Sequence, residues 1–273
     1  MHQITGKTLI GFLLALTTAV LWGILPIALK VLLEVFTTNT ITAIRFLFAA
    51  LMVGVWLGLR GKLPSLALMK QRKIFILMAI AVVGLLLNYS GLLLFFNERL
   101  LSLIVQASNE TLGVILVIFA AITWAAYALA QKQLLVSYSS KQIMYLIYFA
   151  GSIAFIPVSD FTPLGQLSVL QWSLLLFCCL NTVVAYGAFA EALHHWEASK
   201  VSAVLAITPL VTIISANIVA AIWPDLLIPQ QLNIWSWLGA ILVVMGSALT
   251  ALAPQFVQYR EARRVRKLQR DVL

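Results

Sequence analysis

The chain has few charged residues for its length. Asp, Glu, Lys and Arg make up only 10% of the 273 residues, whereas a soluble domain averages about 25%. Acidic side chains are the scarcest, with nine in all, while 62% of the residues are hydrophobic. The mean hydropathy is +1.02. Because the apolar runs are too long and unbroken for the alternating strands of a membrane barrel, the sequence predicts an all-α polytopic membrane protein.

The sequence also lacks the signatures of an enzyme. It contains no G-x-S-x-G, H-E-x-x-H, phosphate-binding loop or dinucleotide fingerprint. The cysteines Cys178 and Cys179 are adjacent within an apolar run, which is typical of small buried hydrophobes rather than of a disulfide. His194 and His195 are neighbours on a helix and point in different directions, so they do not form a metal site. We expect no catalytic residues, no cofactor and no metal.

What the chain does have is a series of long apolar segments. A membrane-spanning helix needs about 20 predominantly apolar residues. The longest connections have about fourteen residues, which leaves no room for a soluble domain. We predict about eight spans, at 8–33, 39–59, 74–96, 112–131, 142–158, 171–191, 200–223 and 234–253.

The basic residues are concentrated beside the spans. One cluster lies in the short loop 60–73 and another in the tail 254–273, and together they account for much of the net charge of +9. Positive loops stay on the cytoplasmic side, so eight spans put both the N and C termini in the cytoplasm. This placement favours membrane lipid headgroups, not nucleic acid, as the partner of the positive charge.

Two of the spans resemble each other. "GFLLALTTAVLWGILPIALKVLL" (11–33) aligns without a gap to "GVILVIFAAITWAAYALAQKQLL" (113–135), which matches a Gly, a Trp and a Lys at one offset. The alternative is chance similarity between two apolar helices. Because three spans precede the second copy, the repeat is inverted, as in many secondary transporters that bind substrate near the midplane between the halves.

Five segments of the chain share the pattern of a known membrane repeat. "EASKVSAVLAITPLVTIISANIVAAIW" (197–223) and "WSWLGAILVVMGSALTAL" (235–252) resemble the last two helices of the EamA domain of the drug/metabolite transporter superfamily. "TTAVLWGILPIALK" (17–30) and "FAAITWAAYALAQK" (119–132) resemble its first helix, and "ITAIRFLFAAL" (41–51) its second. The resemblance implies a multi-pass protein of the inner (plasma) membrane that carries metabolites or drugs.

The first repeat departs from the family pattern. Family members usually have ten helices in two inverted repeats of five, but here "NYSGLL" runs directly into "LLFFNERL", which reads like the end of a fifth helix. About 40–45 residues, or two helices, are absent. We therefore expect a truncated repeat of three helices at 8–96, a complete repeat of five at 112–253, and a basic cytoplasmic tail at 254–273.

The candidate site residues are polar, aromatic or helix-distorting residues within apolar spans. Arg45 must face a cavity, a partner or the interface. It either binds an anionic substrate or takes part in gating, or it serves a structural pairing or extends to the membrane surface. For each of the other cavity candidates, packing between helices is the alternative to a role in substrate binding. Glu191 is the candidate for a coupling carboxylate, and its alternative role is that of a charge at the membrane interface. The cavity candidates are Trp22, Arg45, Asn88, Tyr89, Trp124, Tyr186, Pro209 and Asn217.

Two functions follow from these expectations. The first is a secondary transporter that exports a small metabolite or drug-like compound by alternating access. The second is a non-transporting remnant or a membrane interaction subunit, completed by a partner or by a second copy of the chain in a homodimer.

The eight-span topology places residue 97 outside the cytoplasm. We predict that an Asn97→Cys variant reacts with a membrane-impermeant maleimide added to intact cells, because three spans separate this position from the cytoplasmic N-terminus. Labelling of residue 97 from the cytoplasmic side alone would contradict the eight-span arrangement.

Overall fold

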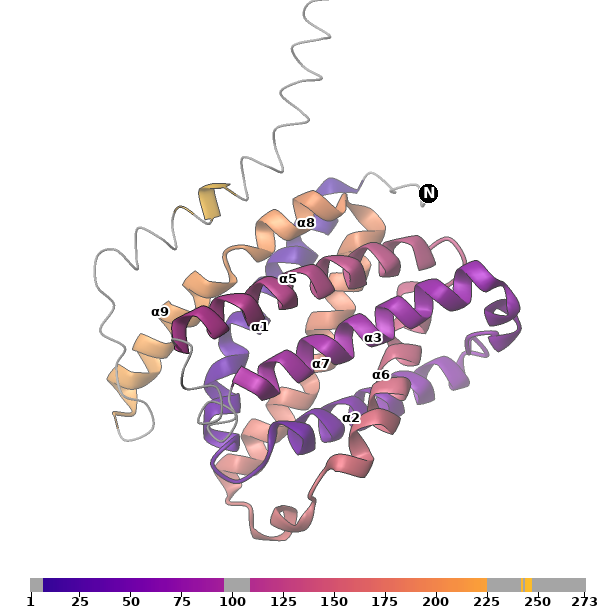
Figure 1. Cartoon of the computed structure of the whole chain (residues 1–273). Coiled ribbons are helices and arrows are strands. Elements are labelled where there is room, and N and C mark those ends of the chain that lie inside the picture. Colours follow the sequence, from indigo (N-terminus) through magenta and orange to yellow (C-terminus); the bar gives the residue numbers. More distant parts are fainter. Residues whose placement is uncertain (1–6, 96–108, 225–241, 243, 247–273) are drawn as a thin grey trace, which may run out of the picture.

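The computed structural model describes residues 7–95, 109–224, 242 and 244–246 (Figure 1). Side chains at 68–69, 84–95 and 109–117 lie outside this description. The described chain is built from helices and contains no strand, which confirms the predicted all-α class. The main helices are α1 (Thr8–Leu32), α2 (Thr38–Leu59), α3 (Arg72–Phe95), α5 (Asn109–Leu134), α6 (Ser140–Phe155), α7 (Val169–His195), α8 (Ala198–Leu205) and α9 (Thr208–Ile222), with 3-10 turns at Leu66–Lys70, Ile156–Val158 and Thr162–Gln166.

These helices coincide with the predicted spans. Five stretches of the described chain are long and apolar enough to cross a membrane: Thr8–Leu32, Thr38–Leu59, Ser140–Val158, Val169–His195 and Ala198–Ile222. Helices α3 and α5 occupy the positions of two further predicted spans. The chain is therefore a polytopic helical membrane protein. The last predicted span, 234–253, and the tail, 254–273, fall almost wholly outside the described residues.

The predicted span 200–223 is divided into two helices. Helix α8 ends at Leu205 and α9 begins at Thr208, with Pro209 in its first turn. A proline lacks the backbone N–H, and the first turn of a helix has no intrahelical acceptor for that group, so the proline is accommodated there without loss of a hydrogen bond. Pro209 thus lies at the start of a helix, whereas the apolar pattern of 200–223 predicts one continuous span around it.

Local side-chain caps define where several helices begin. Ser139 and Gln142 form a reciprocal capping box at the start of α6, and Ser168 and Gln171 form another at the start of α7. Thr37 accepts a hydrogen bond from the backbone N–H of Thr40 at the start of α2. Each cap satisfies backbone N–H groups that the first helical turn leaves without partners.

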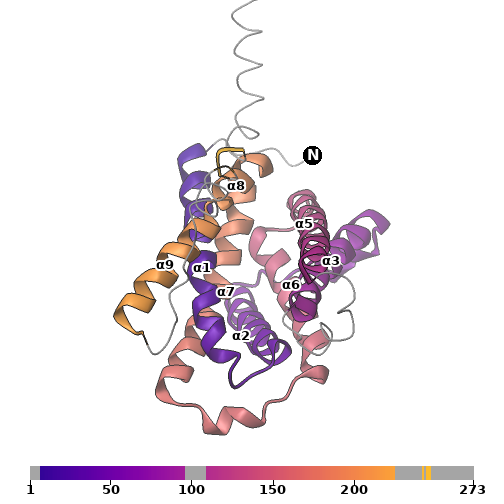
Figure 2. The same ribbon diagram turned by 60° about the vertical axis from the view of Figure 1, so that its left-hand side comes forward.

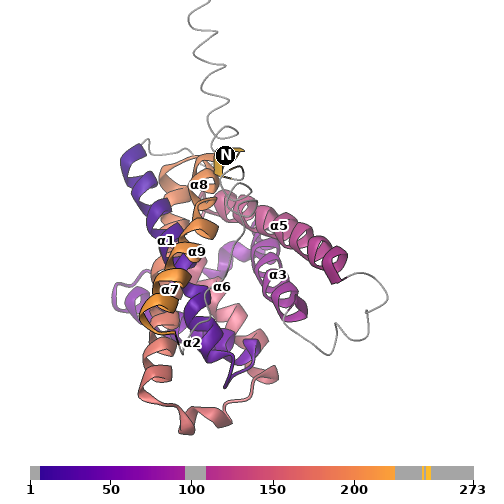
Figure 3. The ribbon, with the colours of Figure 1, turned by 90° about the vertical axis from the view of Figure 1, so that its left-hand side faces the viewer.

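The described helices associate in three dominant pairs. The most extensive contacts join α1 to α7, α3 to α5, and α2 to α6, and α1 is also covered by α8 and α9. Figure 2 shows α1, α8 and α9 on one side of the bundle, and Figure 3 shows α3 beside α5, set apart from α1 and α9. Exchanging α1 with α5, α2 with α6 and α3 with α7 turns the α1/α7 pair into the α5/α3 pair. The same exchange leaves the α2/α6 pair unchanged, so the three dominant pairs are preserved.

The α2/α6 pair packs through a glycine. A Cβ atom at Gly151 would meet the ring of Phe46. The Phe46 ring is fully buried and lies 5.8 Å from that of Tyr148 and 6.3 Å from that of Phe155, between ring centroids. A small residue at position 151 therefore lets the two helices approach closely, which is the packing that holds helices together in a bilayer.

We predict that Gly151→Ala lowers the free energy of unfolding by about 1–3 kcal/mol, because overpacking forces the Phe46 ring or the α2 backbone to shift. Gly187→Ala in α7 is the matched control, since nothing lies within 4 Å of a Cβ placed there, and a helical glycine-to-alanine change adds up to about 1 kcal/mol of stability. Thermal unfolding of the purified protein in detergent measures both. Equal midpoints for the two variants would contradict the close α2/α6 approach.

Candidate substrate site

The two tryptophans that match in the internal repeat lie against each other. Trp22 comes from α1 and Trp124 from α5, and their ring centroids are 5.2 Å apart in an edge-to-face arrangement with an interplanar angle of 79°. Aromatic pairs favour this geometry because the positive ring edge meets the negative face. Residues 102 positions apart in the sequence thus form one contact between the two predicted halves.

Three further rings complete what we call the aromatic cluster: Trp22, Trp124, Tyr127, Tyr186 and Phe189. The ring centroid of Trp22 is 4.9 Å from that of Tyr186 and 5.6 Å from that of Phe189. The Trp124 centroid is 5.0 Å from that of Tyr127 and 5.3 Å from that of Phe189. Helices α1, α5 and α7 therefore meet through aromatic side chains.

The sequence pattern indicates Trp22, Trp124 and Tyr186 as candidates but not Tyr127 or Phe189. A usable signal was present: Tyr127 is three residues after Trp124, and Phe189 is three residues after Tyr186. Residues three apart share a helix face. An aromatic residue three positions after a candidate is therefore a further candidate for the same site. Phenylalanine is common in apolar helices, however, and its presence alone does not mark a site.

Polar atoms without partners lie in this part of the bundle. The indole Nε1 of Trp22 is buried and has no hydrogen-bond partner among the described residues, and the same holds for Oδ1 of Asn181. The Asn181 amide Nδ2 donates to the Leu21 carbonyl oxygen at 2.7 Å, one turn before Pro26. An unsatisfied buried polar group costs about 1–3 kcal/mol, so such groups are suited to a bound water or ligand.

A buried arginine lies next to the aromatic cluster. Arg45, from α2, is 2% exposed, and its Nε donates to Thr182 Oγ1 of α7 at 2.7 Å. The Thr182 hydroxyl donates to the Cys178 carbonyl oxygen at 2.8 Å, and the Tyr148 hydroxyl of α6 donates to the Thr182 carbonyl oxygen at 2.9 Å. Arg45 is therefore fixed by helix-to-helix hydrogen bonds and does not extend to the membrane surface.

Thr182 connects the arginine to the rings. Tyr186 follows Thr182 by four residues on α7, about 6 Å along the helix axis. The Tyr148 ring, whose hydroxyl bonds to Thr182, has its centroid 6.5 Å from that of Tyr186. The residue that binds the Arg45 guanidinium and the ring of Tyr186 are thus about one helical turn apart on α7.

The remaining candidates are Asn88, Tyr89, Pro209, Asn217 and Glu191. Asn88 and Tyr89 belong to α3, but their side chains lie outside the described residues. Pro209 is exposed, and the Asn217 amide donates to the Ile213 carbonyl oxygen of its own helix at 2.9 Å. Glu191 pairs with His195 at 3.5 Å near the end of α7.

Glu191 lines a separate cavity. The cavity has a volume of about 360 Å³ and lies beside the α5–α6 turn, with Tyr138, Lys141 and His194 among its lining residues. In the described part of the chain, no group of three or more His, Cys, Asp or Glu side chains could hold a metal ion.

Comparison with known proteins assigns the chain to a family. The model of the EamA-like transporter family matches residues 9–104 and 111–252, which together span most of the chain. The chain belongs to the EamA-like transporter family. As an EamA-type drug/metabolite transporter it is a multi-pass protein of the inner membrane.

Similar proteins carry transporter names. The chain is 35% identical to the "uncharacterized inner membrane transporter YhbE" of Escherichia coli (strain K12) and of Shigella flexneri, over 89% of this chain and 91% of theirs. It is 33% identical to an "uncharacterized transporter" of Haemophilus influenzae, over 93% of this chain and 98% of that protein. No solved structure matches the EamA chain.

The alignments with these relatives are longer than the part of this chain that they cover. The Escherichia coli alignment runs over 293 positions, but 89% of the 273 residues supplies only about 243 of them. About 50 positions therefore have no counterpart in this chain, and the 304-position alignment with the Haemophilus protein leaves about 50 as well. This difference is the size of two membrane spans with their connections.

We predict that Thr182→Val lowers the free energy of unfolding by about 2–4 kcal/mol, because it removes the hydroxyl that accepts from the buried Arg45 guanidinium. Thr182→Ser keeps the hydroxyl and should remain within about 1 kcal/mol of the native protein, since only a methyl group is lost. Thermal unfolding in detergent compares the two. A Ser variant as unstable as the Val variant would show that the hydrogen bond is not the important contact.

Proposed function

We propose that this EamA protein is a secondary transporter that exports small metabolites or drug-like compounds across the inner membrane by alternating access. The observation that carries the proposal is the 5.2 Å contact between Trp22 and Trp124, which lies where helices of the two halves converge. Transporters built from inverted repeats bind substrate at the interface between the repeats. The aromatic cluster and Arg45 are the proposed substrate-binding residues, together with Asn88 and Tyr89 of α3.

The helix pairing supports two inverted halves. An exchange of the first three helices with α5, α6 and α7 reproduces the three dominant pairs, as a twofold relation between the halves requires. Because the exchange maps the α2/α6 pair onto itself, the twofold axis would pass between these two helices. The matched Trp22 and Trp124 meet across the same axis.

The comparisons support halves of unequal size. The first segment matched by the family model, 9–104, is shorter than the second, 111–252, and the relatives have about 50 aligned positions that this chain lacks. We infer a first repeat of three helices at 8–96 and a second of five at 112–253.

The buried charge favours a substrate of a particular kind. Among the buried positions that the structure describes, Arg45 is the only charged residue, so no Asp or Glu is buried with it there. A buried guanidinium attracts an anionic group or a strong hydrogen-bond acceptor, and aromatic rings favour an apolar or planar body. Both features fit a small amphipathic compound.

One observation favours the alternative of an interaction subunit. Ala19 and Gly23 of α1 are buried, and a Cβ at Gly23 would lie 2.6 Å from Val211 of α9. The matching residues of α5, Ala121 and Ala125, are exposed. The face of α5 that corresponds to the α9-covered face of α1 is therefore open to lipid, a partner protein or a second copy.

We predict that Trp22→Ala and Trp124→Ala each reduce transport at least tenfold, since each removes a central ring of the cluster. Trp172→Ala, at an exposed position of α7, is the matched control and should transport normally. The assay is uptake by inside-out membrane vesicles of a panel of radiolabelled amino acids, aromatic carboxylates and cationic dyes. No flux of any probe, together with no ligand-dependent thermal stabilisation, would favour the interaction subunit. An equal loss in Trp172→Ala would contradict the proposed site.

A further inference from the structure

Helices α3 and α5 form a unit that is loosely joined to the rest of the described bundle. They pack extensively on each other, whereas their contacts with α6, α7 and α8 are few. The remaining helices are linked through α1 and α7, which contact each other and several neighbours. Figure 3 shows the α3–α5 pair diverging from the bundle along its length. A pair with few contacts can move as one body against a packed group of helices.

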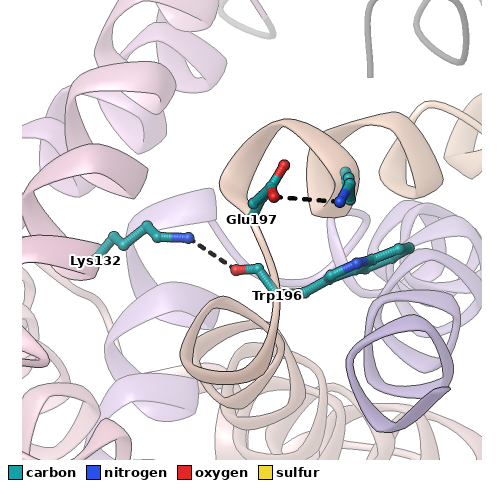
Figure 4. A network of polar contacts seen from close by, with 4 residues as sticks. Lys132, Trp196 and Glu197 are labelled. Atoms are coloured by element: carbon teal, nitrogen blue, oxygen red, sulfur yellow. Dashed lines mark hydrogen bonds and ion pairs between the residues drawn. The ribbon is translucent and has the colours of Figure 1, made fainter. Parts of the chain in front are cut away.

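One polar contact joins the end of α5 to the end of α7. The Nζ atom of Lys132 donates a hydrogen bond to the Trp196 carbonyl oxygen at 2.8 Å (Figure 4). Trp196 is the C-cap residue that follows the last residue of α7, and the last carbonyls of a helix have no intrahelical partner. The ammonium group therefore satisfies a free carbonyl and also complements the negative end of the α7 dipole.

The Trp196 side chain packs against α1 at the same end of the bundle. A Cβ atom at Gly11 of α1 would lie 2.8 Å from the Trp196 Cβ, and the Trp196 ring is edge-to-face with Phe12 at 6.2 Å. Its indole Nε1 is buried with no hydrogen-bond partner in the described chain. Because a buried donor without an acceptor costs free energy, release of this ring into water would recover part of that cost.

These contacts lie between the cytoplasm and the aromatic cluster. Trp124 precedes Lys132 by eight residues on α5, about 12 Å along the axis. Phe189 precedes Trp196 by seven residues on α7, about 10 Å along the axis. In the predicted topology both helices run toward the cytoplasm, so Lys132 and Trp196 meet on the cytoplasmic side of the cluster.

We propose that the Lys132–Trp196 contact is a cytoplasmic latch. While Lys132 holds the α7 terminus, the α3–α5 pair stays against the bundle and the cluster is closed to the cytoplasm. When the bond breaks, the pair swings away and the cluster opens inward. Lys132 is thus a gating residue that does not touch the substrate. The inference rests on the proposed transport, but its test requires no substrate.

The test measures access to a buried position behind the latch. Ala192 is fully buried on α7, one turn before Trp196, and its carbonyl accepts from the Trp196 N–H at 2.8 Å. Ala192→Cys is placed in a Cys178→Ala/Cys179→Ala background and reacted with a hydrophilic maleimide in inside-out membrane vesicles. We expect Lys132→Met to raise the labelling rate about tenfold, as loss of a state-specific contact shifts the population of open molecules.

The controls separate the latch from general loosening. Lys132→Arg keeps a cationic donor and should label close to the native rate. Lys141→Met removes another lysine at the same end of the bundle, 4.5 Å from the Trp56 ring centroid, and should leave labelling unchanged. If Lys132→Met fails to fold, Lys132→Gln takes its place. Unchanged labelling on loss of the Lys132 charge, or an equal rise with Lys141→Met, would overturn the latch. Absence of flux with the expected labelling would count against the proposed transport alone.

Discussion

The arrangement depends on how closely α1 packs against α7. In a bilayer the lipid is as apolar as the side chains, so helices associate through close packing and interhelical hydrogen bonds rather than through the hydrophobic effect. Both occur here: Ala15 and Ala19 of α1 are fully buried, and the Thr18 hydroxyl donates to the Ala185 carbonyl oxygen at 3.1 Å. This contact brings Trp22 to the α7 rings Tyr186 and Phe189, and the Phe189 ring in turn contacts Trp124.

The same packing connects structure to the proposed mechanism. The cluster joins α1 and α7, which belong to the well-packed part of the described bundle, to α5, which is held mainly by α3. Motion of the α3–α5 pair would separate Trp124 from Trp22 and so change the site itself. The buried Arg45 is hydrogen-bonded to Thr182, which lies about one turn before Tyr186 on α7. It would therefore remain with α7 during this motion and keep a positive charge beside the packed helices.

The sequence predicts the fold class well because apolar length and basic clusters directly reflect the bilayer. It predicts the helix positions, and the matched offset identifies Trp22 and Trp124 as corresponding residues, although it does not predict that their rings touch. It does not predict the α8–α9 break, since a proline in an apolar run fits a kink as well as a helix start, and only neighbouring helices decide between them. It also misses Phe189, because contacts across helices are set by interhelical packing that no single helix encodes.

The central claim, that the two halves converge at their matched tryptophans, is tested most directly by cross-linking. Trp22→Cys and Trp124→Cys are combined in a chain with Cys178 and Cys179 replaced by alanine, treated with a short bifunctional methanethiosulfonate, and cleaved by a protease at a site inserted between residues 96 and 108. If the halves converge there, the two fragments of one chain remain joined after cleavage and separate on reduction. Fragments that separate without reduction, or that are joined only between different copies, would contradict it.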